Sequence, residues 1–354
     1  MSDGAPAVHG AFAALFGDAE VARLFSNEAL TRDMMVVETA LTRAAGTVGL
    51  VSEELAARAA QALAALTPDE SALAAGTLVD GLPVPALIRD LKHRLPEDLH
   101  PAIHPGSTSQ DVLDTALILA LSRANNVLAA RLDHVVRQLD DLGREWGSAS
   151  LIGRTRMQAA LPILAGHRIG AWRAPLVSAT ERLAALRATL ERVQIGGAVG
   201  DRNPYGAKAD AFADAVADAL GLHRAKAAWH TDRSAIAEYA GWLSMVAGAL
   251  GKIGQDVALM AQQGIDEIAL AGGGTSSAMP HKANPIGAEN LVTLARFVAT
   301  QLPVLHHALV HEQERSGSAW LLEWLVLPQM VTATGAALRT ANDLIGSVER
   351  IGPA

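Results

Sequence analysis

The sequence contains no cysteine and few aromatic residues. Cysteine is missing from all 354 positions, and phenylalanine, tryptophan and tyrosine together make up only 4%. Without thiols the chain has no disulfide, no thiolate nucleophile and no cysteine-ligated zinc or iron–sulfur centre. Hydrophobic residues nevertheless make up 50% of the chain, and alanine, the best helix former, is abundant. This composition favours helices that pack closely through small side chains.

Positive charge is also scarce. The chain has 29 lysine and arginine residues against 37 aspartate and glutamate residues, a formal charge of -8. Nucleic acids and anionic membranes attract a basic face, so neither is an expected partner. The N-terminus lacks the charged start and apolar run of a signal peptide, and no apolar stretch approaches the ~20 residues that cross a bilayer. We therefore expect a cytoplasmic protein.

Long helical patterns dominate the chain after residue 104. Between Ser109 and Trp146 the apolar residues recur mostly every three or four positions, which predicts a helix about 57 Å long at 1.5 Å per residue. A heptad-like apolar pattern extends from Thr231 to Gln263. We also expect kinks at Pro303 and Pro328. Further long helices are predicted at residues 162–193, 285–314 and 318–351.

The first part of the chain has a different texture. Residues 1–103 contain shorter helical patterns, such as Arg32–Gly46 and Ser52–Leu66, separated by frequent turn residues. No segment shows sustained strand alternation. The sequence therefore predicts an all-α protein with an N-terminal helical domain (1–103) and a central long-helix bundle (104–354). Apolar residues on several helix faces favour an oligomer, with a monomeric bundle as the alternative.

Residues 272–285 form the most informative of three polar, glycine-rich interruptions. Asn284 and Pro285 are predicted to cap and begin a helix, whose N-terminus attracts an anion, and Lys282 stands beside it. Ser276 and Ser277 follow three glycines, which allow the segment to move. These features suit a carboxylate-bearing substrate. The alternative is an ordinary flexible loop with an Asn-Pro cap.

The other two interruptions are HPGSTSQD at residues 104–111 and GRTRMQ at residues 153–158. Thr108 and Ser109 can cap the following helix and also donate to a bound carboxylate, although capping alone explains them equally well. Arg154 and Arg156 can grip carboxylates bidentately. The alternative for this segment is a solvated loop.

A histidine pair offers a weak metal-binding signal. His307 and His311 stand four residues apart on a predicted helix, followed by Glu312 and Glu314. That spacing can hold a metal ion, but the HExxH order of zinc proteases is absent. We expect neither a metal nor an organic cofactor.

The three interrupting segments together resemble the fumarase/aspartase superfamily. SSAMPHKANP at residues 276–285 matches every fixed position of its S-S-x-M-P-x-K-x-N-P signature. HPGSTSQD and GRTRMQAALP are similar to its H-x-G-x-T-S-x-D and G-R-T-H-x-Q-x-x-P regions, in the same order. The resemblance implies a bundle of long helices, a homotetramer and active sites that three subunits share. It also implies that the small C-terminal helical domain of many members is missing here.

Within the superfamily the sequence resembles the 3-carboxy-cis,cis-muconate cycloisomerases, notably at WHTDR (229–233) and HEQER (311–315). The histidine of the G-R-T-H motif is Arg156 here, as the cycloisomerases also lack it. Lyases use that histidine in acid–base chemistry. The alternatives are a fumarate-releasing lyase, such as adenylosuccinate lyase, and a catalytically silent scaffold, against which the intact motifs argue.

The resemblance implies specific roles. The substrate that the resemblance implies is a small tricarboxylate that closes to 4-carboxymuconolactone in protocatechuate degradation. Ser276 is the expected proton donor, and Lys282 the expected catalytic cation, with His281 as a further cation nearby. The expected substrate-binding residues are His104, Thr108, Ser109, Arg154, Thr155, Arg156, Gln158, Ser277, Asn284 and Arg315.

Overall fold

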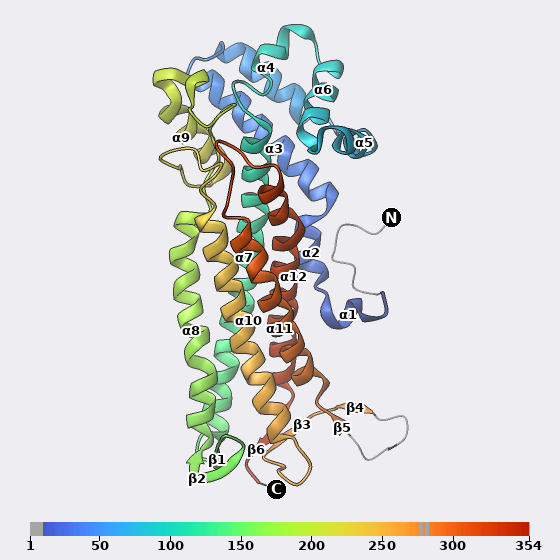
Figure 1. Ribbon diagram of the computed structural model, residues 1–354, viewed down its shortest axis with the longest axis vertical. Coiled ribbons are helices and arrows are strands. Elements are labelled where there is room, and N and C mark those ends of the chain that lie inside the picture. Colours follow the sequence, from blue (N-terminus) through green and yellow to red (C-terminus); the bar gives the residue numbers. More distant parts are fainter. Residues whose placement is uncertain (1–9, 276–278, 280–282, 354) are drawn as a thin grey trace.

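The protein is an elongated column of long helices with a cap of shorter helices at one end (Figure 1). The computed structural model describes residues 10–275, 279 and 283–353. The all-helical prediction is confirmed, since long antiparallel helices make up the column. They are α7 (Ser109–Trp146), α8 (Ala165–Leu190), α10 (Ser234–Met260), α11 (Ile286–His307) and α12 (Ser318–Gly346).

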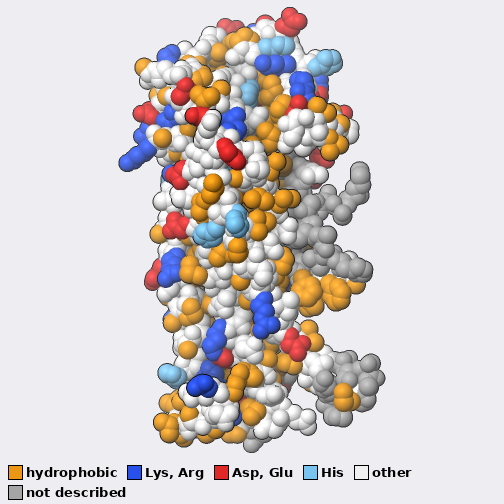
Figure 2. All heavy atoms as spheres, viewed as in Figure 1, with side chains coloured by type: hydrophobic (Ala, Val, Ile, Leu, Met, Phe, Trp, Pro, Cys, Tyr) orange, Lys and Arg blue, Asp and Glu red, His pale blue; other side chains and the backbone are white. Residues whose placement is uncertain are grey.

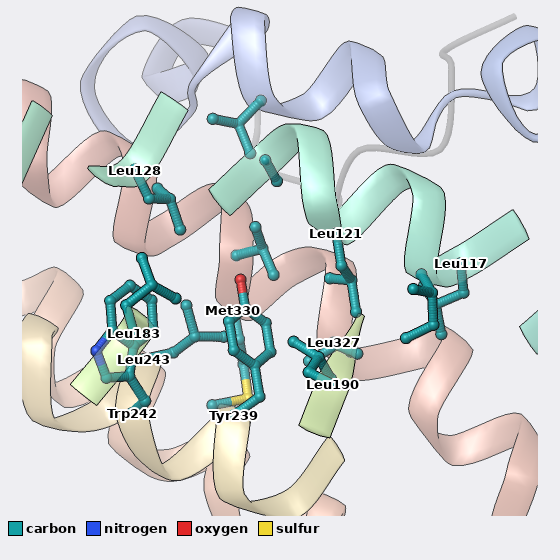
Figure 3. Close-up of a cluster of buried hydrophobic side chains, with 14 of the residues drawn as sticks. Leu117, Leu121, Leu128, Leu183, Leu190, Tyr239, Trp242, Leu243, Leu327 and Met330 are labelled. Carbon is teal, nitrogen blue, oxygen red and sulfur yellow. The ribbon is translucent and has the colours of Figure 1, made fainter. Parts of the chain in front are cut away.

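The predicted apolar patterns form the core of this column. α7 has the bounds that the sequence predicted, and every apolar position of the heptad-like pattern in α10 is buried. Figure 3 shows Tyr239 and Trp242 of α10 among leucines of α7 and α8 and Met330 of α12. The Tyr239 hydroxyl donates to Asn125 Oδ1 (2.6 Å), and the Trp242 indole donates to Ala179 O (2.9 Å). Both polar groups are therefore satisfied inside the core.

Small residues let α10 and α11 approach closely, as the composition suggested. A Cβ atom at Gly254 would lie 2.4 Å from Ala288 O, and one at Gly251 would lie 2.5 Å from the Ala295 side chain. Because a larger residue at either position would push the helices apart, glycine is required there.

The shorter helices gather around the N-terminal end of α7 (Figure 1). Ser52 caps α4 as predicted, accepting from the Leu55 N–H at 3.2 Å. Buried residues on both sides of residue 103 belong to one apolar core, so the domain boundary stays a prediction. The shorter helices of the cap are α3 (Asn27–Thr47), α4 (Glu53–Ala64), α5 (Glu70–Asp80), α6 (Pro83–Arg94) and α9 (Ala209–Leu220). Two further short helices, α1 (Ala13–Phe16) and α2 (Ala19–Ala22), lie along the column instead.

Three short antiparallel strand pairs, which the periodicity did not predict, occur at the opposite end. They shorten two predicted helices, because residues 162–164 and 348–351 lie in strands rather than at helix ends. α8, α11 and α12 each continue across an internal proline (Pro175, Pro303 and Pro328) as one helix. The pairs are β1 (Ser150–Thr155) with β2 (Gln158–Leu164), β3 (Ile268–Leu270) with β6 (Val348–Ile351), and β4 (Gly274–Thr275) with β5 (Ala283–Asn284).

Two core helices are apolar enough to have the composition of membrane spans. α7 and α12 each contain an 18-residue window with mean hydropathy 1.3, of which 72% and 67% is buried. The expectation that no stretch approaches this composition was therefore wrong. Packing of these helices inside the column accounts for their apolar character.

Candidate active site

The N-terminal end of α7 carries the first predicted segment, and Asp111 organises it. Thr108 occupies the N-cap position as predicted, and Asp111 Oδ2 accepts from its backbone N–H at 3.1 Å. The same carboxylate accepts from the N–H groups of Gly196 and Gly197, both at 2.9 Å, and lies 2.8 Å from His230 Nε2. This buried acid therefore holds Thr108 and Ser109 in one position against the loop that follows α8.

A buried ionic network lies one turn further along α7. The Arg233 guanidinium donates to both oxygens of Asp114, at 2.7 and 3.0 Å, and to Glu323 at 2.8 Å. Trp320 donates to Asp114 Oδ1 at 2.9 Å, and the Trp229 ring lies 4.7 Å from the guanidinium carbon. Three separate parts of the chain meet in this network, so it ties α7, α10 and α12 together beneath the site.

Two further predicted residues lie near this end of α7. Arg315 Nε donates to Gln110 Oε1 at 3.0 Å, and its Nη2 donates to Ala198 O. His104 Nδ1 lies 2.7 Å from Glu38 Oε1. Burial opposes protonation of His104, but the Glu38 carboxylate outweighs it and raises the histidine pKa above its ordinary value. The site therefore has a permanent cation, Arg315, and a histidine whose protonated form is favoured by Glu38, near the N-terminus of α7.

The second predicted segment forms the tip of the β1–β2 hairpin. Thr155 pairs with Gln158, and the two residues between them have positive φ angles, 49° at Arg156 and 66° at Met157. Side chains rarely adopt this left-handed region, which glycine or asparagine usually occupies in such turns. Non-glycine residues there carry backbone strain, which often accompanies function. Arg156 is exposed, and Arg154 pairs with Glu267 at 2.5 Å.

The third segment differs from its prediction at the helix start. Asn284 is paired with Gly274 in the β4–β5 ladder, so it is extended and does not cap α11. Pro285 takes the N-cap position without a side-chain hydrogen bond, and the helix begins at Ile286. A cavity of about 560 Å³ borders Asn284. Four predicted residues of this segment lie outside the described residues, namely Ser276, Ser277, His281 and Lys282.

The structure brings only two of the three segments to the same end of the molecule. β1–β2 and β4–β5 lie at the lower end in Figure 1, whereas the N-terminus of α7 lies near the cap of shorter helices. The length of α7, about 57 Å, separates Thr108 from the hairpin. Within one chain, therefore, no single cavity can collect all the predicted site residues.

The polar residues that organise the first segment were not predicted individually. Asp111 and Asp114 interrupt the apolar face of α7 and are fully buried, as are Gln110 and Gln194. A buried carboxylate requires donors, so polar residues at apolar positions of the predicted helix are the signal that would have identified them. His230, by contrast, was noted only as part of the WHTDR segment, which resembles the cycloisomerases.

The histidine pair does not have the geometry that the metal hypothesis assumed. α11 ends at His307, so His311 lies beyond the helix and the two residues are not one turn apart on it. Among the described residues, no group of three or more histidine, aspartate or glutamate side chains is placed to hold a metal ion. Burial lowers the pKa of His311, and the nearby Arg233 adds to this effect.

The long-helix column with its three motif segments is the architecture of the fumarase/aspartase superfamily. A family model described as "Lyase" matches residues 14–300. The chain is 32% identical to 3-carboxy-cis,cis-muconate cycloisomerase of Acinetobacter baylyi, over 96% of this chain and 77% of the relative. It is 37% identical to nitrosuccinate lyase of Streptomyces davaonensis, over 90% and 70%.

A solved structure agrees with these relatives. The 3-carboxy-cis,cis-muconate lactonizing enzyme from Pseudomonas putida superposes with a TM-score of 0.88 at 34% identity, over 96% of this chain and 77% of that one. The chain therefore belongs to the lyase family of the fumarase/aspartase superfamily. It is an enzyme of the lyase or cycloisomerase type.

Proposed function

We propose that the protein is a cycloisomerase that converts 3-carboxy-cis,cis-muconate to 4-carboxymuconolactone in protocatechuate degradation. The observation that carries the proposal is Arg156 at the exposed hairpin tip, where lyases of the superfamily have a histidine. A guanidinium is a permanent cation rather than a proton carrier, so it suits binding of a third carboxylate. The likeness to named cycloisomerases over nearly the whole chain supports the same activity.

The proposed reaction is an intramolecular addition. A substrate carboxylate oxygen attacks a carbon of the diene, forming the lactone C–O bond, and the electron pair moves toward the carbon next to another carboxylate. Ser276 gives its proton to that carbon and regains one from solvent, so no group leaves. Lys282 and the N-terminus of α11 stabilise the charge that spreads into the carboxylate.

The separation of the segments supports a shared active site. Thr108 and Arg156 lie at opposite ends of the column, so a site that contains both needs at least two subunits. We propose that a homotetramer supplies the three segments from three different subunits, as in the superfamily that the chain resembles. The charges of the described residues on the face shown in Figure 2 are mixed in sign. A tricarboxylate must therefore be attracted by the local cations of the assembled site rather than by the whole surface.

We also propose that the protein acts in the cytoplasm.

Product identification tests the proposed function. Purified protein incubated with 3-carboxy-cis,cis-muconate is expected to remove the diene absorbance and to form 4-carboxymuconolactone, identified by NMR. A parallel incubation with nitrosuccinate and with adenylosuccinate, assayed for fumarate, tests the lyase alternative. Fumarate from either compound without lactone formation would contradict the cycloisomerase.

The lyase alternative rests on two findings. The family is a lyase family, and the sequence identity of this chain is higher with the nitrosuccinate lyase (37%) than with the cycloisomerase of Acinetobacter baylyi (32%). All reactions of this type require stabilisation of charge next to a carboxylate, which the same serine and lysine can provide. The residue at position 156 is the feature that favours the cycloisomerase.

Arg156→Ala tests the role of the hairpin cation. We expect KM for the tricarboxylate to rise about 10-fold or more, because a charged hydrogen bond contributes about 1.5–3 kcal/mol. The stability should stay close to that of the wild type, because Arg156 is exposed and makes no ion pair with another described residue. Steady-state kinetics measure the change. An unchanged KM and turnover number would remove Arg156 from the site.

A further inference from the structure

Glu267 lies between two arginines at the base of the β1–β2 hairpin. Arg154 Nη1 lies 2.5 Å from Glu267 Oε1, and Arg168 Nη1 lies 3.0 Å from Glu267 Oε2. Both guanidinium groups also donate to the carbonyl of Ile152, at 3.1 and 3.2 Å. The Glu267 side chain is only 7% exposed. We call Arg154, Arg168 and Glu267 the hairpin clamp.

The backbone of Glu267 is attached to the rigid end of the column. Its N–H donates to Met260 O, at the end of α10, and its carbonyl accepts from Gly352 N, both at 2.9 Å. Arg168 belongs to the first turn of α8. The clamp therefore joins the hairpin to α8, α10 and the residue after β6, so the hairpin cannot pivot without breaking an ion pair whose carboxylate is buried and whose Arg154 side chain is 30% exposed.

An irregularity in the hairpin directs Arg154 into this clamp. The β1–β2 register shifts between Ile152 and Arg154, where Gly153 of β1 stands opposite two residues of β2, Ala160 and Leu161. Such a bulge increases the local twist of the strand pair and redirects neighbouring side chains. A Cβ atom at Gly153 would lie 3.0 Å from Leu161 O, so a side chain there would crowd the bulge. Arg154 consequently points back to the base of the hairpin.

The two arginines of the GRTRMQ segment are therefore in different electrostatic states. Arg154 shares the single carboxylate of Glu267 with Arg168, so its charge is partly compensated, and the pKa of Glu267 is lowered overall. Burial opposes ionisation of this acid, and the hydrogen bonds from Arg154 and Arg168 outweigh the burial. Arg156, two residues further at the strained turn, is exposed and makes no such contact with a described residue.

We propose that Arg154 is a positioning residue and not a substrate ligand, and that the clamp with Glu267 and Arg168 fixes the turn that presents Arg156 to the tricarboxylate. This inference rests on the proposed function for the identity of the substrate. It replaces the prediction that both arginines bind substrate. It also assigns functional roles to Glu267 and Arg168, which no motif contains.

Glu267→Ala separates the two roles of Arg154 because they predict changes of opposite sign. If Arg154 positions the turn, loss of Glu267 releases the hairpin, and KM for 3-carboxy-cis,cis-muconate rises about 10-fold or more with a smaller fall in the turnover number. If Arg154 binds substrate, removal of its acidic partner frees a cation, and KM stays unchanged or falls. Glu267→Gln, which keeps one acceptor oxygen, should give an intermediate KM.

Arg168→Ala provides an independent second variant. Arg168 lies outside the motif, so only the clamp predicts that its loss raises KM in the same way as Glu267→Ala. Arg173→Ala is the matched control, because Arg173 also lies on α8 and pairs with an acid, Asp140, that is 39% exposed. The control should leave KM unchanged. An increase in KM for Arg173→Ala equal to that for Arg168→Ala would overturn the proposal.

Amide hydrogen exchange of residues 150–164 tests the clamp without any substrate. Glu267→Ala and Arg168→Ala are expected to exchange faster than wild type in this hairpin, with no change at the buried centre of α10. Unchanged exchange in the hairpin would overturn the clamp. Because this measurement is independent of turnover, it remains decisive even if the proposed substrate proves wrong.

Discussion

Replacing Ser276 with alanine is expected to lower the turnover number for 3-carboxy-cis,cis-muconate by about 10²- to 10⁴-fold, the range that a positioned general acid contributes. The lactone forms only if a proton reaches the carbon next to a carboxylate. Alanine removes the hydroxyl that we assign to this transfer and changes little else. Steady-state kinetics, with circular dichroism to verify folding, measure the effect.

Ser277→Ala is the matched control for this prediction. Both serines belong to the same SSAMPHKANP segment, and each change removes one hydroxyl. We assign Ser277 to substrate binding, so its loss should act mainly on KM. A Ser276→Ala enzyme with near wild-type turnover would exclude the serine as proton donor. Equal losses of turnover in the two variants would show that the chemistry is not specific to Ser276.

Arg233→Met is expected to lower the free energy of unfolding by about 3–5 kcal/mol. Methionine has a similar length but leaves two carboxylates, Asp114 and Glu323, without their guanidinium, and both residues are 0% exposed. Removing one partner of a buried ionic network costs more than the network itself contributes, because the remaining charges are uncompensated. Urea denaturation measures the loss.

The pH dependence of this loss has a definite sign. Burial raises the pKa of Glu323 above its ordinary value even though Arg233 opposes the change, and Arg233→Met removes that opposition. A carboxyl whose pKa is raised by folding favours the folded state below its unfolded pKa and loses this advantage as the pH rises. The deficit of the variant should therefore be smaller near about pH 5 than near about pH 8.

A surface ion pair provides the control for Arg233→Met. Arg144 pairs with Asp141 at the exposed end of α7, with 72% of the arginine side chain accessible. Because water solvates both charges, Arg144→Met should leave the unfolding free energy nearly unchanged at either pH. If Arg233→Met were equally harmless, the network would not stabilise the junction of α7, α10 and α12.

The long helices could be predicted because their signals are local. The apolar residues of α7 repeat at helical spacing, and Thr108 and Asp111 form its N-terminal cap within four residues. The strands could not be predicted in the same way. β6 (Val348–Ile351) is a strand because it pairs with β3 (Ile268–Leu270), about eighty residues earlier, and helical periodicity carries no information on that partner.

The residues of the candidate site show the same difference between local signals and long-range contacts. The sequence by itself determined the long helices, the three motif segments and the family that they resemble, because each depends on residues that are close together in the chain. Only the tertiary structure decided that Thr108 and Arg156 lie at opposite ends of α7, and that Arg154 pairs with Glu267 while Arg156 has no ion pair with a described residue. These outcomes depend on contacts between residues far apart in sequence, where burial and charge compensation determine which side chains remain available to a substrate.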